Sequence, residues 1–313
     1  MDKIVFFHMN QLGDLLFSLP VLKAAKKESG AKIISVVKSS LSPLLLSSGV
    51  VDCVIPKEKS KIKLINALRK ENDGKAVLFS ESPASVLSAY FAGFKNMTGF
   101  ETAALSFLFT NKVKRIGVPS ISNNTELGKA AGFKDIQSDY TGIVNIPEKN
   151  ISNIKEWFLK NKFNPVNTIA VSAGASKKRR DKCLPVKIWT EIIDSLYDFG
   201  YNCVLAGASW EIENLSKISE KSKSSPALFT AENGILDSAA FFSYCPLFIG
   251  TDSGAMHLAA ALKKKCIGIF TKTDPMQIGP MPLRNHIIIK KNNTNEVSAK
   301  EIIESVTYLH TAS

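Results

Sequence analysis

An aspartate early in the chain lies where it could take part in acid–base chemistry. The segment Gln11-Leu12-Gly13-Asp14 separates an apolar run from an amphipathic helical pattern over 15–27. We expect Asp14 at the carboxyl end of a strand, where its carboxylate could deprotonate a substrate hydroxyl, while Gly13 permits a tight turn or a close ligand approach. The alternative is a helix N-cap, where backbone amides favour the charged carboxylate and lower its pKa.

A cationic loop follows an apolar run at 168–172. Small residues that include Ser176 lead there into Lys177-Lys178-Arg179-Arg180-Asp181-Lys182. Exposed backbone amides together with ammonium and guanidinium groups suit a pyrophosphate. A solvated charged loop without a ligand is the alternative, but the position directly after a strand favours binding.

A second loop, Thr251-Asp252-Ser253-Gly254-Ala255-Met256-His257, also joins a strand to a helix. Amides at the start of that helix would be available to an anion. Because Asp252 would repel a phosphate that it faced, we expect it to cap the helix and orient those amides. His257, in the first turn, either donates to a ligand or satisfies a local carbonyl.

Two further strand ends give weaker signals. Gly207 ends one strand and Glu211 opens the following helix, where its carboxylate could accept hydrogen bonds from ribose hydroxyls. The helix dipole alone also favours a glutamate in a first turn. The segment Thr271–Pro275 offers hydroxyls and one lysine to the same edge, or simply forms a capped turn.

The elements that must position these residues alternate between short strands and helices. The helical pattern over 187–199 places Trp189, Ile192, Ile193 and Leu196 on one face. This alternation predicts parallel βαβ units, and hence two doubly wound α/β domains that cover 1–148 and 149–313 and bind ligands in a cleft at the strand ends. The expected strands are 3–7, 32–37, 53–55, 75–79, 168–172, 202–206, 247–250 and 266–270.

Composition narrows the class of protein. The 313 residues are 45% apolar and 22% charged, which excludes wholesale disorder, and 40 Lys and Arg against 28 Asp and Glu give a net charge of +12. The charge suggests nucleic acid, an acidic membrane or a phosphorylated substrate, or else a lysine-rich proteome. No apolar stretch reaches the ~20 residues of a membrane span. Five widely spaced cysteines indicate a reducing compartment, so we expect a cytoplasmic protein without a zinc site.

Several motifs in this order resemble the ADP-heptose:lipopolysaccharide heptosyltransferase family (glycosyltransferase family 9). The early segment 13–22 is similar to its G-D-hydrophobic-x-x-x-x-P-hydrophobic-L signature, and 251–262 is similar to its D-[ST]-G-x-x-H-L-A-A-A-L signature. Segments 182–189 and 273–279 resemble further family motifs. Phe17 and Cys183-Leu184 depart from the family pattern.

The resemblance implies a GT-B fold of two Rossmann-like domains, with acceptor binding in the first and nucleotide-sugar binding in the second. It implies an inverting glycosyltransferase that moves heptose from ADP-heptose to the lipopolysaccharide inner core without a metal or another cofactor. Asp14 would be the base, with Gln11 and Gly13 on the acceptor side. The donor diphosphate would lie at Ser176, Lys182, Asp252, Ser253, Gly254, Ala255 and His257, and the nucleoside at Gly207 and Glu211.

The expected partners follow from the same resemblance. They are a nucleotide sugar and an acidic glycolipid at the cytosolic face of the inner membrane, with peripheral membrane contact and no nucleic acid. We expect a monomer. The alternatives are a GT-B enzyme that uses another nucleotide sugar, including an epimerase, and a two-domain protein that binds a nucleotide sugar without catalysis. The absence of Walker A, G-x-G-x-x-G, H-E-x-x-H and G-x-S-x-G motifs argues against other enzyme classes.

Overall fold

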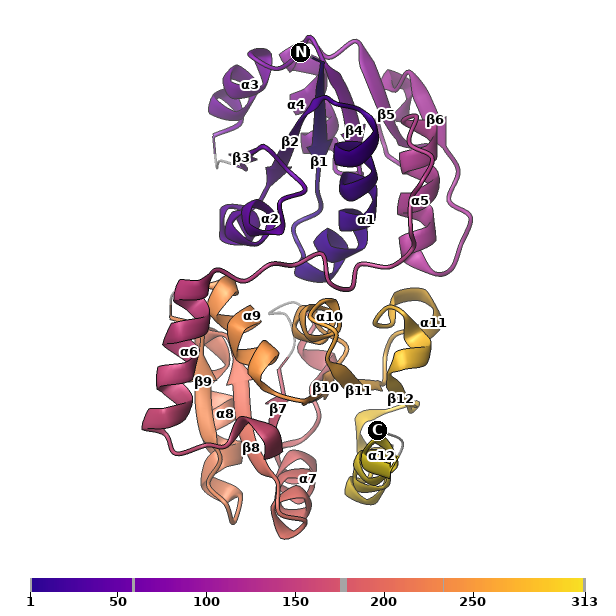
Figure 1. Ribbon diagram of the computed structural model, residues 1–313. Coiled ribbons are helices and arrows are strands. Elements are labelled where there is room, and N and C mark those ends of the chain that lie inside the picture. Colours follow the sequence, from indigo (N-terminus) through magenta and orange to yellow (C-terminus); the bar gives the residue numbers. More distant parts are fainter. Residues whose placement is uncertain (1, 58–59, 175–178, 233, 312–313) are drawn as a thin grey trace. The chain divides into compact units, whose positions relative to one another are not determined.

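The computed structural model describes residues 2–57, 60–174, 179–232 and 234–311 (Figure 1). The chain divides into two compact units, residues 1–145 and 146–313. The sequence places this boundary a few residues later, after residue 148. No helix among the described residues is both long enough and apolar enough to cross a membrane.

The first unit is a parallel sheet with helices on its faces. Its six strands lie in the order β3-β2-β1-β4-β5-β6, so the order reverses between β1 and β4. This is the order of dinucleotide-binding folds, which bind ligands outside the carboxyl ends of the strands at the reversal. The strands are β1 Lys3–Phe7, β2 Lys32–Val37, β3 Cys53–Pro56, β4 Lys75–Leu78, β5 Asn96–Phe100 and β6 Asn111–Val113; the helices are α1 Leu12–Glu28, α2 Ser42–Ser48, α3 Lys61–Arg69, α4 Pro83–Ala92 and α5 Ser120–Ala130.

The second unit repeats this architecture. Its strand order is β12-β11-β10-β7-β8-β9, which is the same winding and reverses between β7 and β10. The strands are β7 Thr168–Ser172, β8 Asn202–Gly207, β9 Ala227–Thr230, β10 Leu247–Thr251, β11 Lys265–Phe270 and β12 Ile287–Lys290; the helices are α6 Glu148–Lys160, α7 Val186–Asp198, α8 Ile212–Lys221, α9 Ile235–Tyr244, α10 Gly254–Ala261, α11 Pro275–Ile278 and α12 Ala299–Thr311. Both sheets therefore confirm the predicted doubly wound α/β class.

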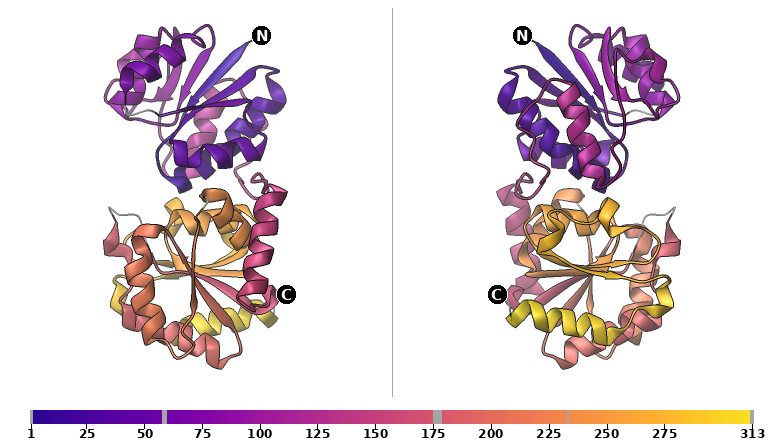
Figure 2. Two further views of the ribbon diagram at one scale, coloured as in Figure 1. Left: turned by 90° about the vertical axis from the view of Figure 1, so that its left-hand side faces the viewer. Right: turned by 90° about the vertical axis from the view of Figure 1, so that its right-hand side faces the viewer.

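The central strands are buried on both faces because helices cover each side of each sheet (Figure 2). This burial explains why their sequences are continuous apolar runs rather than alternating ones. The predicted apolar face of α7 is confirmed, since Trp189, Ile192, Ile193 and Leu196 are all fully buried. The other face of the second sheet is covered by an aromatic cluster in which Phe241 stacks on Phe229 at 4.2 Å between ring centres.

The strands that the sequence pattern missed are β5, β6, β9 and β12. They lie at or next to sheet edges, and each of them contains at least one polar or small residue. Edge strands need less apolar surface than central strands, so their sequences carry a weaker signal. Apart from the loop after the edge strand β3, the loops described next follow strands inside the sheets.

Candidate active site

One carboxylate joins three loops at the carboxyl end of the second sheet. The Lys182 ammonium, from the loop after β7, donates to Oδ2 of Asp252, which follows β10. Thr273, which follows β11, donates its hydroxyl to the same oxygen at 2.7 Å. The Lys182 and Asp252 side chains are only 11% and 7% exposed. The ion pair therefore lies in a low-dielectric setting where loss of either partner would be costly.

The role expected for Asp252 as a helix cap is wrong. The N-cap residue of α10 is Ser253, and the Asp252 carboxylate is instead engaged by Lys182 and Thr273. A buried ammonium attracts a carboxylate more strongly than helix amides do, because its full charge is poorly screened there. Asp252 therefore acts on any bound anion through Lys182 rather than by capping the helix.

The start of α10 offers the features of an anion site. The first amides of a helix have no partner within the helix, so those of Gly254 and Ala255 point outward from its positive end. The Ser253 hydroxyl makes no capping bond, and no other partner for it is found in the described part of the chain. Because Asp252 immediately precedes this turn, the ion pair places Lys182 beside it. The predicted diphosphate residues Lys182, Asp252, Ser253, Gly254 and Ala255 thus share one location.

His257 lies within α10 and is buried. Burial lowers the pKa of its imidazole to about 4, the nearby Asp252 opposes this shift, and His286 and Lys182 add to it. The ring is therefore neutral at pH 7 and can donate a hydrogen bond but not a positive charge. His286, which precedes β12, is a neighbour that no sequence motif identified.

Glu211 lies against two glycines on neighbouring strand ends. Its Oε2 accepts the Ala208 amide at 2.7 Å, and a Cβ on Gly174 would come within 1.6 Å of its Oε1. A Cβ on Gly207 would lie 3.1 Å from Oε2. The absence of a side chain at Gly174 therefore makes room for this carboxylate. The sequence predicted Gly207 and Glu211 as a pair. It placed Gly174 only in the small-residue loop after β7 and did not connect it with Glu211.

The cationic run contributes unequally to the site. Arg179 is exposed and pairs with Asp181 at 3.2 Å, so its charge is satisfied locally, whereas Lys182 turns inward to Asp252. Ser176, which the sequence assigned to the diphosphate, lies outside the described residues, as do Lys177 and Lys178.

In the first unit, Asp14 follows the carboxyl end of β1. α1 begins at Leu12 with Gln11 as its N-cap residue, so Asp14 lies within the first turn and the N-cap alternative is wrong. Gly13 is likewise helical and does not form the expected turn. The helix begins at Leu12, before the expected start at residue 15. The Asp14 carboxylate, partly exposed, still lies near the positive end of a helix dipole.

The segment before Asp14 is held by a buried histidine that the sequence did not single out. His8 Nδ1 and Nε2 lie 3.0 Å from the hydroxyls of Ser18 and Ser35, respectively, and the ring stacks on Phe79. Burial, followed by the charge of Lys57, lowers its pKa to about 3. His8 therefore ties the end of β1 to α1 and β2 in its neutral form.

Lys57 anchors the same segment from the loop after β3. Its ammonium donates to the backbone oxygen of His8 and, at 3.0 Å, to Oδ1 of Asn10. Burial lowers its pKa to about 8. The sequence pattern could not predict this role for Lys57. Only the order of strands in the folded sheet brings the end of β3 close to the loop between β1 and α1.

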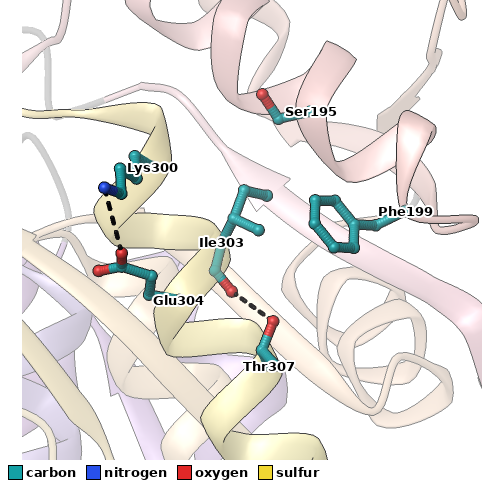
Figure 3. A pocket seen from close by; sticks show the side chains of 6 residues that line it. All are labelled: Ser195, Phe199, Lys300, Ile303, Glu304 and Thr307. Carbon is teal, nitrogen blue, oxygen red and sulfur yellow. Dashed lines mark hydrogen bonds and ion pairs between the residues drawn. The ribbon is translucent and has the colours of Figure 1, made fainter.

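A surface groove in the second unit contains none of the predicted site residues. A groove of about 540 Å³ lies between α7 and α12 (Figure 3). Its apolar side chains come from Phe199 and Ile303, and it is lined by Ser195, Phe199, Lys300, Ile303, Glu304 and Thr307. No group of three or more His, Cys, Asp or Glu side chains that could hold a metal ion occurs within the described ranges.

Comparisons with known proteins agree on one family. The sequence model of "Glycosyltransferase family 9 (heptosyltransferase)" matches residues 62–307. "Lipopolysaccharide heptosyltransferase 1" of Escherichia coli K12 is 23% identical over 98% of this chain and 100% of its own length. "Lipopolysaccharide heptosyltransferase 2" of the same strain is 21% identical over 91% of this chain and 87% of its own.

Solved structures match over the whole chain. A glycosyltransferase family 9 protein from Veillonella parvula superposes with a TM-score of 0.88 at 17% identity, covering 100% of this chain and 98% of its own. E. coli heptosyltransferase WaaC, solved with ADP-2-deoxy-2-fluoro heptose, gives a TM-score of 0.77 at 21% identity, covering 99% and 100%. These matches confirm the predicted GT-B fold.

Asp252→Asn should destabilise the protein by about 3–5 kcal/mol, because it leaves the buried Lys182 ammonium unpaired. Chemical denaturation measures this change. Glu126→Gln, which breaks the exposed pair with Lys129, should cost less than about 1 kcal/mol. The double variant Lys182→Met/Asp252→Leu should recover most of the loss. Equal costs for the buried and the exposed variants would contradict the account of this pair.

Stability should fall as the pH drops from about 6.5 toward 4. His8 and His257 have folded pKa values of about 3 and 4, so the unfolded chain binds protons in this window and the folded chain does not. Each histidine then contributes a slope of up to roughly 1 kcal/mol per pH unit, and its contribution is fully retained above 6.5. Denaturation of wild type, His8→Gln and His257→Gln at several pH values measures the slopes. Unchanged slopes in both variants would refute the assignment.

Proposed function

Because the chain belongs to glycosyltransferase family 9, the heptosyltransferase family, we propose that it transfers heptose from ADP-heptose to a hydroxyl of the lipopolysaccharide inner core. The observation that carries the proposal is the buried Lys182–Asp252 pair beside the start of α10, inside the region that the family model matches. The ADP-heptose analogue in the E. coli WaaC structure and the names of the E. coli relatives support the donor and the acceptor class.

The second unit would bind the donor. The Lys182 ammonium and the first amides of α10 would stabilise negative charge on the diphosphate as it leaves, an arrangement that needs no reorganisation at the moment of reaction. Thr273 would fix the Asp252 carboxylate, and Asp252 would hold Lys182 in position before a ligand binds. Neutral His257 would act as a hydrogen-bond donor, and Glu211 would accept from the ribose.

The first unit would bind the acceptor and supply the base. The Asp14 carboxylate would take the proton of the acceptor hydroxyl while its oxygen attacks the anomeric carbon. The bond from that carbon to the diphosphate would break, and ADP would leave from the opposite side. A single displacement of this kind inverts the anomeric configuration. Lys57 and His8 would keep the segment before Asp14 in place, with Gln11 and Gly13 on the acceptor side.

We further propose that the reaction requires no metal and no other cofactor. A protein ammonium and helix amides can replace a divalent cation in stabilising a leaving diphosphate. We assign this role to the ammonium of Lys182, which Asp252 holds beside the start of α10. The alternative donor class is another nucleotide sugar, and the donor test below separates the two.

The proposed acceptor is an acidic glycolipid at the cytosolic face of the inner membrane, met by a cytoplasmic monomer that binds no nucleic acid. The net charge of +12 supports an anionic partner. The site supports a diphosphate over nucleic acid, because the Lys182 side chain is buried and paired with Asp252 and does not lie on an exposed cationic surface.

Asp14→Asn should lower kcat for heptose transfer by about 10²–10⁴-fold, because an amide cannot accept the hydroxyl proton. Affinity for ADP-heptose, measured by calorimetry, should stay within about twofold, since Asp14 acts on the acceptor hydroxyl and not on the donor diphosphate. Asp135→Asn, an exposed carboxylate of the same unit, is the matched control. Transfer by Asp14→Asn at the wild-type rate would exclude Asp14 as the base.

ADP should raise the melting temperature of the wild type, and UDP should do so less, because ligand binding stabilises the native state. Lys182→Met should lose this ADP-dependent rise and at least about tenfold in donor affinity, one charge-assisted contact of ~1.4 kcal/mol. Lys217→Met removes an exposed lysine of the same unit and should leave the rise intact. A larger rise with UDP would favour the alternative donor.

Turnover should be unchanged in excess EDTA, because Lys182 and the α10 amides carry the charge stabilisation. The measurement is ADP release with and without chelator, repeated after addition of Mg²⁺. Loss of activity in EDTA that Mg²⁺ restores would contradict the metal-free scheme and would leave the donor assignment standing.

A further inference from the structure

The charged side chains on the outer layer formed by α3 and α4 in the first unit are all positive. Residues 59–70 and 82–100 contain no Asp or Glu. In the described part of this layer, every charged side chain is an exposed cation, namely Lys61, Lys63, Arg69, Lys70 and Lys95.

Large apolar side chains stand among these cations. Tyr90 and Phe91, at the C-terminal end of α4, are 49% and 56% exposed, and their rings are in contact at 5.5 Å between centres. Ile62, at the start of α3, is 72% exposed. Leaving these groups in water is unfavourable, so the surface has apolar area available for burial against a partner.

Direct contacts bring the two helices into one surface. α3 and α4 pack against each other on the same side of the sheet (Figure 1). The Asn72 side chain, just after α3, donates to the backbone oxygen of Ala92 at 2.8 Å and so ties the C-terminal ends of the helices together. This bond brings the end that carries Arg69 and Lys70 next to the end that carries Tyr90 and Phe91.

Described acidic residues next to the layer are paired with cations. Glu71 pairs with Lys3 at 3.2 Å and with Lys32 at 3.8 Å, and Asp73 pairs with Lys3 at 2.9 Å. Glu81, just before α4, pairs with Arg115 at 3.1 Å.

The exposed aromatics of the second unit have a different setting, since Phe199 borders a groove that contains Glu304 as well as Lys300. A surface of one sign attracts an extended anionic partner along its whole area, and the charged side chains of the α3–α4 face are cations.

We propose that the α3–α4 face docks the protein on an anionic lipid bilayer. Aromatic side chains are favoured at the level of lipid headgroups, and lysines extend their ammonium groups to phosphates while their alkyl stems cover apolar surface. Each cation near such a surface strengthens binding by roughly fivefold. Docking through this face rests on the proposed function, because it names the unit that meets a membrane-embedded acceptor.

The test is sedimentation of the full-length protein with vesicles. Mixed phosphatidylglycerol–phosphatidylcholine vesicles should bind the protein, pure phosphatidylcholine vesicles should not, and high salt should release it. Arg69→Glu/Lys70→Glu should weaken binding by at least about 25-fold, because two cations are lost at roughly fivefold each. Tyr90→Ser/Phe91→Ser should weaken it by about tenfold or more, since two rings lose their burial.

Matched variants in the second unit are the controls. Lys187→Glu/Lys300→Glu and Tyr197→Ser/Phe199→Ser alter exposed side chains and should bind vesicles like the wild type. Melting temperatures check that every variant is folded. Equal losses of vesicle binding in the control variants would overturn the proposal. Binding of the wild type to heparin without binding to vesicles would overturn it as well.

A transfer assay separates this proposal from the proposed function. With a soluble, delipidated acceptor, the α3–α4 variants should turn over at the wild-type rate, because they do not touch the site. Vesicle binding without any transfer by the wild type would refute the proposed function and leave the docking face intact. Normal transfer without vesicle binding would do the reverse.

Discussion

The buried ion pair between Lys182 and Asp252 is the interaction on which the candidate donor site depends. Removing two charges from water is costly, and apolar residues of similar size would be at least as stabilising. The pair instead fixes the loops after β7 and β10 to each other, and Thr273 adds the loop after β11 through the same oxygen. Its position beside the first turn of α10 indicates a functional rather than a structural reason for keeping charges there.

Strand order explains why residues far apart in sequence reach that point. In both sheets the order reverses at the first strand, so the loops on either side of the reversal diverge and leave their ends accessible. Lys182 and Asp252 are 70 positions apart and meet at the reversal between β7 and β10. In the first unit Lys57 follows the edge strand β3, away from the reversal, and its ammonium still reaches the segment that leads to Asp14.

Much of this could be predicted from the sequence. Continuous apolar runs identified the central strands, and the spacing of Trp189, Ile192 and Leu196 identified the buried face of α7. Long-range polar contacts could not be predicted. Asp252 was expected to cap α10 because it would repel a phosphate that it faced. The sequence pattern could not show that a distant cation, Lys182, engages its carboxylate. The close approach of Glu211 to Gly174 was missed for the same reason, since it joins two loops that lie far apart in the sequence.

The most direct test of the account is mass spectrometry of the product. The purified protein would be incubated with ADP-heptose and a lipopolysaccharide acceptor that lacks inner-core heptose. The account predicts that the acceptor gains one heptosyl residue in the presence of EDTA, and that Lys182→Met abolishes most of the gain. An unmodified acceptor, or a gain of mass only with a different nucleotide sugar, would contradict it.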